Sequence, residues 1–208
     1  MWVHTKESQD KITPADALEL LKEGNKRFRN NLKMDRHLLT QVNLSSEGQY
    51  PFATVLSCID SRTSAELIFD QGLGDIFSIR IAGNVINDDI LGSMEYACDV
   101  VKSKIIMVLG HTKCGAITSA CDQVESGHLA GLLRKIQPAI NQESVTRTDR
   151  NGRNYSFVKN VSTIHVRLMI NQIRAESPIL SRLEKEGSIR IEGGLYDIDS
   201  GEVTFFDD

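Results

Sequence analysis

The sequence predicts an α/β protein with a mostly parallel central β-sheet flanked by helices, an N-terminal helical arm and a C-terminal hairpin. Two observations carry this prediction. Short apolar runs recur at 52–58, 76–81 and 104–109, and such runs are typical of strands that are buried on both faces. Segments with apolar residues at helical spacing separate the runs, and this alternation indicates parallel strands covered by helices.

The 208 residues suffice for a single domain, with an N-terminal arm over 1–50 and an α/β core over 51–208. In the arm, Thr13 is a suitable cap for a helix that Pro14 opens, and an apolar face follows. Residues 30–50 are polar and predict irregular structure.

The core continues the alternation in order. The expected helices cover 63–70, 88–102, 115–124, 129–143 and 156–175, and a shorter helix follows the break at Ser177-Pro178. A fourth strand is expected over 189–192. The segments 196–198 and 203–205 alternate around Ser200-Gly201, which predicts a hairpin. This pattern leaves the order of the strands in the sheet open.

Composition and charge argue against several function classes. The net charge is −4 and no Lys/Arg-rich block occurs, so we expect no nucleic-acid partner. No apolar run approaches the roughly 20 residues that cross a bilayer, so we expect no membrane partner. The N-terminus lacks the apolar centre of a secretory signal. We therefore expect a cytoplasmic protein, although a leader already removed would leave no trace.

Two of the buried strands end in residues that carry chemistry. The first ends in Cys58 to Arg62 (CIDSR), and the third ends in Gly110 to Gly115 (GHTKCG). Ligand sites in parallel α/β sheets form at the carboxyl ends of strands, so both motifs are expected at one sheet edge. Cys58, His111 and Cys114 supply two thiolates and one imidazole, a set that suits zinc. Three protein ligands leave a fourth position open, as in catalytic sites.

Two other interpretations of these residues stay open at this point. A cysteine at a strand end is often a buried apolar residue, and His-x-x-Cys alone is a weak signal. A cysteine near a helix N-terminus, as expected for Cys114, is also typical of a redox thiol, so Cys58 and Cys114 are alternatively a redox pair. Four cysteines are too few for a disulfide scaffold, and we expect Cys98 and Cys121 to be buried apolar residues.

The motifs together resemble the beta-class carbonic anhydrases. Cys-x-Asp-Ser-Arg is followed about fifty residues later by His-x-x-Cys. The stretch from Glu66 to Asn84 is similar to the segment that these enzymes carry between their zinc motifs. Gly24 to Phe28 and the ending GGLYDIDSGEV are similar to bacterial members. The resemblance extends from about residue 13 to residue 206.

This resemblance implies the reversible hydration of carbon dioxide to bicarbonate and a proton, by attack of a zinc-bound hydroxide. It implies one Zn²⁺ per chain, with Cys58, His111 and Cys114 as ligands. Asp60 and Arg62 match the catalytic Asp–Arg pair of the family. Asp60 binds zinc itself only in a closed state, which Arg62 opposes by holding the carboxylate. Family members are oligomers, so a homodimer or homotetramer is expected.

Gln49, Phe77, Ala82 and Tyr96 match family positions that line the substrate pocket, often across a dimer interface. Gln49 stands nine residues before Cys58, where the plant-like branch places a glutamine that contacts substrate. Without the resemblance, Ala82 and Tyr96 would be taken as core residues.

The sequence departs from some bacterial members at a regulatory bicarbonate site. Those members place Trp three residues before the first zinc cysteine and Gly directly before it. Here Val55 and Ser57 occupy these positions, and the single Trp is Trp2. Arg80 matches a third residue of that site, for which we expect a general structural role. We therefore predict no inhibition by bicarbonate of that kind.

The sequence does not single out one proton shuttle or one exact substrate. Four further histidines are shuttle candidates by residue type only: His4, His37, His128 and His165. Two other functions stay open, namely hydrolysis of an analogue such as carbon disulfide or carbonyl sulfide, and a noncatalytic zinc-binding interaction protein. Intact Asp60 and Arg62 argue against the second of these, because a structural zinc site does not need them.

Overall fold

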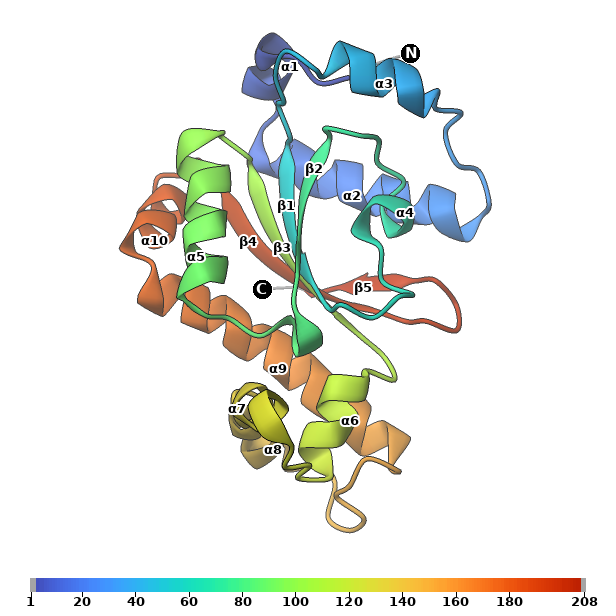
Figure 1. Cartoon of the computed structure of the whole chain (residues 1–208), viewed down its shortest axis with the longest axis vertical. Coiled ribbons are helices and arrows are strands. Elements are labelled where there is room, and N and C mark those ends of the chain that lie inside the picture. The colour runs from blue at the N-terminus through green and yellow to red at the C-terminus, as the bar shows by residue number, and fades with distance from the viewer. Residues whose placement is uncertain (1–2, 207–208) are drawn as a thin grey trace.

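The computed structural model describes residues 3–206, and its centre is a five-stranded sheet in the order β2-β1-β3-β4-β5 (Figure 1). The strands are β1 (Ala53–Ser57), β2 (Ile76–Arg80), β3 (Ile105–His111), β4 (Arg190–Tyr196) and β5 (Val203–Phe205). The first four run parallel, and β5 pairs antiparallel with β4. The predicted fold class is therefore confirmed. In the part of the chain described, no helix combines the length and apolar character needed to span a bilayer.

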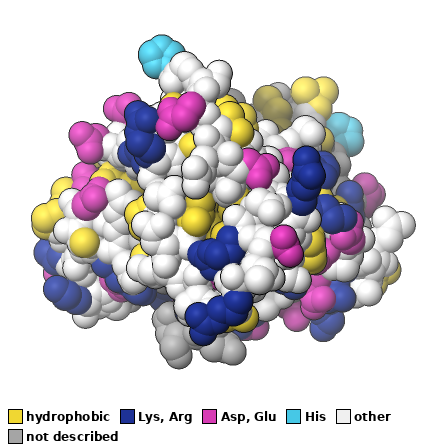
Figure 2. Space-filling model, turned by 90° about the horizontal axis from the view of Figure 1, so that it is seen from below, with side chains coloured by type: hydrophobic (Ala, Val, Ile, Leu, Met, Phe, Trp, Pro, Cys, Tyr) yellow, Lys and Arg dark blue, Asp and Glu magenta, His cyan; other side chains and the backbone are white. Residues whose placement is uncertain are grey.

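The helices cover both faces of the sheet. They are α1 (Lys6–Lys11), α2 (Pro14–Arg29), α3 (Leu38–Leu44), α4 (Ala65–Ile68), α5 (Asp88–Glu95), α6 (Gly115–Cys121), α7 (Gly127–Arg134), α8 (Gln137–Gln142), α9 (Tyr155–Glu176) and α10 (Pro178–Lys185). A 3₁₀ turn, η1 (Ala82–Asn84), follows β2, and a π-helical turn, η2 (Tyr96–Val100), extends α5. The space-filling view from below shows Lys and Arg interspersed with Asp and Glu on that face (Figure 2).

Alternation along the central strands divides the core into two layers. In β1 and β3, Val55 and Met107 pack with α2 and α4, while Leu56 and Val108 pack with α5, α9 and α10. Every residue of both strands is buried, as the apolar runs predict for strands covered on two faces. A third cluster joins α6, α7, α8 and the start of α9, and it includes Cys58 and Cys114. The two cysteines thus lie where this cluster meets the sheet.

The predicted start of the first long helix is confirmed in detail. Thr13 and Asp16 form a reciprocal capping box, and Pro14 occupies the first turn of α2. Behind this helix, the buried carboxylate of Asp70 accepts hydrogen bonds from Arg27 and Arg36, at 2.6 Å from Arg27 Nε. Because Arg27 and Arg36 belong to the arm, Asp70 fastens the arm to the core.

Some expected boundaries were wrong. Residues 30–50 contain α3, whose apolar residues are largely exposed, so its sequence lacks the one-sided pattern of a packed helix. The helix expected over 129–143 is interrupted at 135–136, just before Pro138 in the first turn of α8. The fourth strand runs to Tyr196, so it and the first arm of the hairpin are one strand.

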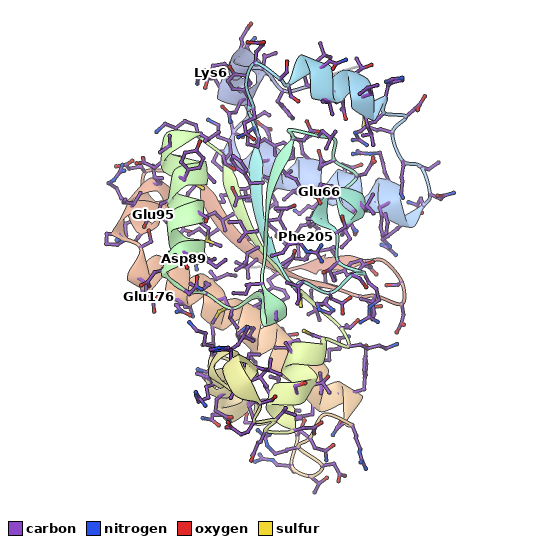
Figure 3. The ribbon with its side chains drawn as sticks, in the orientation of Figure 1. Lys6, Glu66, Asp89, Glu95, Glu176 and Phe205 are labelled. Atoms are coloured by element: carbon purple, nitrogen blue, oxygen red, sulfur yellow. The ribbon has the colours of Figure 1, made fainter. Side chains whose placement is uncertain are left out.

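A partly buried hydrogen bond joins α5 to the start of α10. The Ser177 hydroxyl caps α10 and donates to Glu95 Oε1 at 2.6 Å. Figure 3 places Glu95 on α5 beside the turn between α9 and α10. This contact links α5 to the N-terminus of α10.

Candidate metal centre

The sheet order brings the two sequence motifs together. β1 and β3 are neighbours, and Ser57 pairs with Leu109 in parallel register. Cys58 follows directly after Ser57, and β3 continues for two residues to His111. The expectation that both motifs meet at one carboxyl edge is therefore confirmed.

Cys58, His111 and Cys114 form a compact group of potential metal ligands. All three are buried, and one donor atom from each lies within 4.8 Å of the others. The two sulfur atoms are 4.0 Å apart. In the described residues 3–206, no other group of three or more His, Cys, Asp or Glu side chains meets the same geometric condition.

The orientation of His111 fits a metal ligand. Its Nδ1 lies 2.9 Å from the carbonyl oxygen of Thr112, which can only accept, so Nδ1 carries the proton. Nε2 is therefore left with its lone pair, and it is buried without a hydrogen-bond partner among the described residues. A backbone carbonyl that fixes the tautomer in this way is usual for metal-bound histidine. The donor set and the free Nε2 together fit a metal ion.

The two thiols differ in acidity. The hydrogen bond from Cys114, together with the Gly83 N–H at 3.3 Å, lowers the pKa of Cys58 to about 4. Burial opposes this effect. The neighbouring Cys58 sulfur and burial raise the pKa of Cys114. Cys58 therefore carries the negative charge at neutral pH, and ligation at Cys114 requires the loss of a proton.

The turn between His111 and Cys114 has a fixed shape. Lys113 has a φ of 54°, a left-handed conformation that is uncommon outside glycine, and its ammonium pairs with Asp199 at 2.7 Å. Thr112 donates its N–H to Tyr196 and accepts the N–H of Ile198. The hairpin thus fixes the turn, which lets both ligands of the His-x-x-Cys motif face the same point.

Asp60 lies beside the group, and Arg62 engages both of its oxygens. Arg62 Nε is 2.9 Å from Oδ1, and Arg62 Nη2 is 2.7 Å from Oδ2. These bonds hold the pKa of Asp60 far below its usual range, so the carboxylate is ionised. Asp60 Oδ2 lies 4.0 Å from His111 Nε2. The carboxylate therefore adjoins the position that the three ligands face.

Arg80 and Thr63 hold the loop that carries Asp60 through hydrogen bonds to its backbone carbonyls. Arg80 donates to the carbonyl oxygens of Cys58 and Asp60, at 3.0 and 2.6 Å. The Thr63 hydroxyl donates to the same two carbonyls. Arg80 thus has the structural role expected from the sequence. Trp2 lies outside the described residues, and the absence of bicarbonate inhibition stays a prediction.

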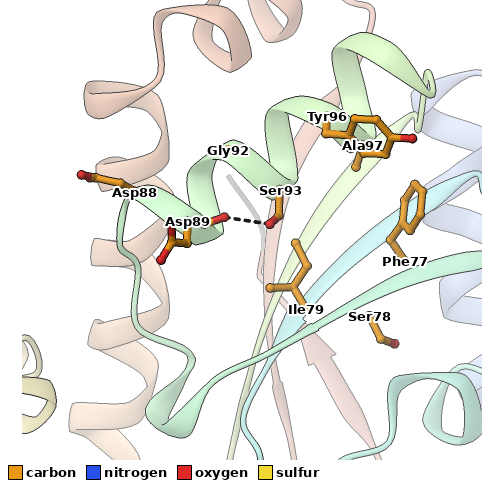
Figure 4. Close-up of a pocket in the computed structure, with 9 residues that line it drawn as sticks. All are labelled: Phe77, Ser78, Ile79, Asp88, Asp89, Gly92, Ser93, Tyr96 and Ala97. Carbon is orange, nitrogen blue, oxygen red and sulfur yellow. Dashed lines mark hydrogen bonds between the residues drawn. The ribbon is translucent and has the colours of Figure 1, made fainter. Parts of the chain in front are cut away.

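Three of the four expected pocket residues do not meet the metal group within one chain. Phe77 pairs with Thr54 near the start of β1, and Tyr96 lies at the end of α5. Their rings are 6.5 Å apart and line an open hollow of about 660 Å³ between β2 and α5 (Figure 4). Gln49 is exposed and precedes β1, at the opposite end from Cys58. Ala82 alone is close to the group, next to Gly83.

The other histidines have different surroundings. His4 is buried against the ring of Phe52, and its Nε2 lies 3.9 Å from Asp75. His37 caps α3, and His128 is exposed on α7. His165 is buried on α9, with Nε2 2.8 Å from the carbonyl oxygen of Gly83.

The fold and the site define an α/β protein with a Cys-His-Cys metal-binding group at the carboxyl edge of its sheet. The family model for carbonic anhydrase matches residues 53–203. Carbonic anhydrase 2 of Mycobacterium tuberculosis (strain CDC 1551 / Oshkosh) is 37% identical over 198 residues, which cover 93% of each chain. Carbonic anhydrase of Mycolicibacterium smegmatis is 36% identical, and the match covers 91% of this chain and 92% of that one.

Solved structures agree with this match. The beta-carbonic anhydrase CcaA superposes with a TM-score of 0.72 at 24% identity, covering 91% of this chain and 95% of its own. A tetrameric beta-carbonic anhydrase of Sordaria macrospora has a TM-score of 0.72 at 22% identity, covering 93% and 95%. The chain therefore belongs to the carbonic anhydrase family, in its beta class. The resemblance found in the sequence is confirmed.

Proposed function

We propose that this carbonic anhydrase hydrates carbon dioxide reversibly to bicarbonate and a proton, using one zinc ion per chain held by Cys58, His111 and Cys114. The observation that carries the proposal is the buried Nε2 of His111, which faces two buried sulfurs and has no hydrogen-bond partner among the described residues. Two sulfurs and an imidazole nitrogen suit zinc, a borderline-soft ion, better than magnesium or calcium, which prefer oxygen ligands.

A bound zinc ion supplies a Lewis acid that ionises water near neutral pH. The side chains around the ion orient the reacting water. Asp60 is ionised and can only accept, so Oδ2 can take a hydrogen bond from the attacking water and direct its lone pair toward carbon dioxide. Arg62 keeps the carboxylate in this position, because both carboxylate oxygens are already bound by the guanidinium. In our proposal this is the open state, in which Asp60 leaves the fourth ligand position free.

The pocket is completed, in our proposal, by a second copy of the chain in a homodimer or homotetramer. β2 is the edge strand of the sheet and pairs only with β1 in the described chain. An unpaired edge is a surface suited to association. Two β2 edges that pair antiparallel about a two-fold axis bring the start of one strand beside the end of the other. Phe77 and Tyr96 of one chain then lie toward the metal group of its partner.

Metal analysis combined with a stopped-flow assay of carbon dioxide hydration tests this function. The natively purified chain is expected to hold about one zinc per chain, and Cys58→Ala is expected to lose both zinc and activity. Cys121→Ala is the matched control, because Cys121 is also buried but lies outside the metal group. A zinc-free, redox-active chain would instead support the thiol interpretation.

The same assay separates the remaining alternatives. Zinc at one per chain without hydration activity would indicate a noncatalytic interaction protein. Turnover of carbon disulfide or carbonyl sulfide, faster than that of carbon dioxide, would assign an analogue as the substrate.

A further inference from the structure

His165 is a buried histidine that lies outside the metal group yet contacts the loop beside it. It lies on α9 and is 1% exposed, and its Nε2 is 2.8 Å from the carbonyl oxygen of Gly83. A carbonyl oxygen only accepts, so Nε2 carries the proton. Burial lowers the pKa of His165 to about 4, so the ring is neutral at pH 7. His165 is thus a fixed N–H donor to Gly83.

Gly83 contacts the metal group with its other polar atom. Its N–H points at Cys58 Sγ, 3.3 Å away. The residue has a φ of 66°, and an added Cβ would lie 3.1 Å from Ile136 and 3.2 Å from Ala116. Both the conformation and the close packing therefore require glycine. The backbone of this one residue joins the His165 ring to a sulfur of the metal group.

Burying the His165 ring has a free-energy cost that an apolar side chain at this position would not have. His165 Nδ1 is buried and has no hydrogen-bond partner among the described residues. A buried polar atom without a partner is destabilising, and an apolar side chain in this place would avoid that penalty. Among the described residues, the hydrogen bond to the Gly83 carbonyl is therefore the one polar contact of the His165 ring.

We propose that His165 is a positioning residue of the metal centre, which holds the Gly83 carbonyl so that the Gly83 N–H stays directed at the Cys58 sulfur. The proposal rests on the metal site of the proposed function and deepens it. A thiolate that accepts an N–H bond donates less charge to a bound metal, and such outer contacts commonly tune metal affinity. Two thiolates already offset the charge of a divalent ion, so this reduction bears directly on the Lewis acidity of the site.

A pair of amide variants tests the position of the donor. The amide nitrogen of His165→Gln reaches about as far from Cβ as Nε2 of histidine, whereas that of His165→Asn reaches only as far as Nδ1. We expect His165→Gln to bind Co²⁺ nearly as tightly as the parent chain in a chelator competition. We expect His165→Asn to bind about 10- to 100-fold more weakly. The thiolate-to-cobalt absorption band is expected to shift in His165→Asn and not in His165→Gln.

The control is Ile173→Val, a mild packing change on the same buried helix face. If Ile173→Val shifts the band and the affinity as far as His165→Asn does, packing explains the effect and the proposal is overturned. Equal affinity and spectra for both amide variants and the parent chain would also overturn it. A parent chain whose cobalt binding is unaffected by Cys58→Ala would instead overturn the metal site itself, and with it both proposals.

Discussion

Arg62 holds the carboxylate of Asp60 through two side-chain hydrogen bonds, one to each oxygen, and its backbone N–H donates a third to the same carboxylate at 3.0 Å. The side chain of Arg62 is half exposed, while that of Asp60 is mostly buried beside the metal group. Arg62, two residues further along the chain, thus fixes the carboxylate of Asp60 beside the three ligands.

Removing the Arg62 side chain is expected to lower hydration activity while the metal stays bound. In Arg62→Ala, Asp60 is free to turn toward the metal and occupy its fourth position. We expect zinc content to stay near one per chain and hydration activity to fall about 10- to 100-fold. Metal analysis and stopped-flow kinetics measure the two quantities separately. Arg134→Ala, which removes an exposed arginine on α7, is the control, and full activity in Arg62→Ala would refute the role of the pair.

A mixture of two defective chains is expected to recover activity if the pocket is shared between subunits. Gln49→Ala keeps its metal ligands, and Cys58→Ala keeps Gln49. In a statistical 1:1 mixture, half of the dimers are mixed, and each contains one site with both features. The expected activity is about a quarter of that of the parent chain. The mixture is co-expressed and assayed beside each single variant, and activity equal to their mean would refute the shared pocket.

The stability of the metal-free chain is expected to fall in acid partly because of His165. Its pKa is lowered to about 4 in the folded chain, while an unfolded histidine titrates near 6.5. As the pH falls from 6.5 to 4, the unfolded chain therefore takes up a proton that the folded chain refuses, and the free energy of unfolding decreases. The difference amounts to about 2–3 kcal/mol at pH 4.5.

Urea unfolding of the metal-free parent chain and of His165→Gln, at pH 7.5 and 4.5, measures this contribution. The variant is expected to lose less stability between the two pH values. Burial also lowers the pKa of His4, but that contribution is common to both proteins and cancels in the comparison. Parallel stability losses in the two proteins would contradict the prediction.

The attachment of the arm is expected to depend on Asp70. Asp70→Asn removes a buried charge that two arginines share, and breaking such a buried pair costs about 3 kcal/mol. The midpoint of urea unfolding measures the loss. Glu202→Gln is the matched control, because its pair with Arg29 is exposed and worth less than about 1 kcal/mol. Similar losses in both variants would show that Asp70 has no special role.

The sequence was sufficient to predict the parts of the fold that depend on periodicity. The apolar runs before Cys58 and His111 predict buried strands, and the structure places these strands side by side. Helix boundary signals, such as Pro14 at the start of α2 and Ser177-Pro178 between α9 and α10, also predict the helix boundaries well. The order of the strands is a long-range property, and the local pattern contains no information on it.

The remaining site features depend on distant contacts that no local motif encodes. Gly83 and His165 are 82 residues apart, and only the packing of α9 under η1 brings them together. The only local hint in the sequence is Gly83 followed by Asn84, two residue types that tolerate positive φ, and Asn84 has a φ of 42°. The role of Gly83 follows only from the contact of its N–H with the Cys58 sulfur. Phe77 and Tyr96 meet each other across the hollow between β2 and α5, which no spacing in the chain indicates.

The parallel pairing of β1 with β3 also has a consequence for how the protein matures. Cys58 and the His111–Cys114 turn approach one another only when these two strands have paired, and about fifty residues separate them along the chain. Parallel pairing over such a span is slow compared with local helix formation. The three ligands are therefore not assembled until the centre of the sheet is complete, so under the proposed function we expect metal binding to follow strand pairing.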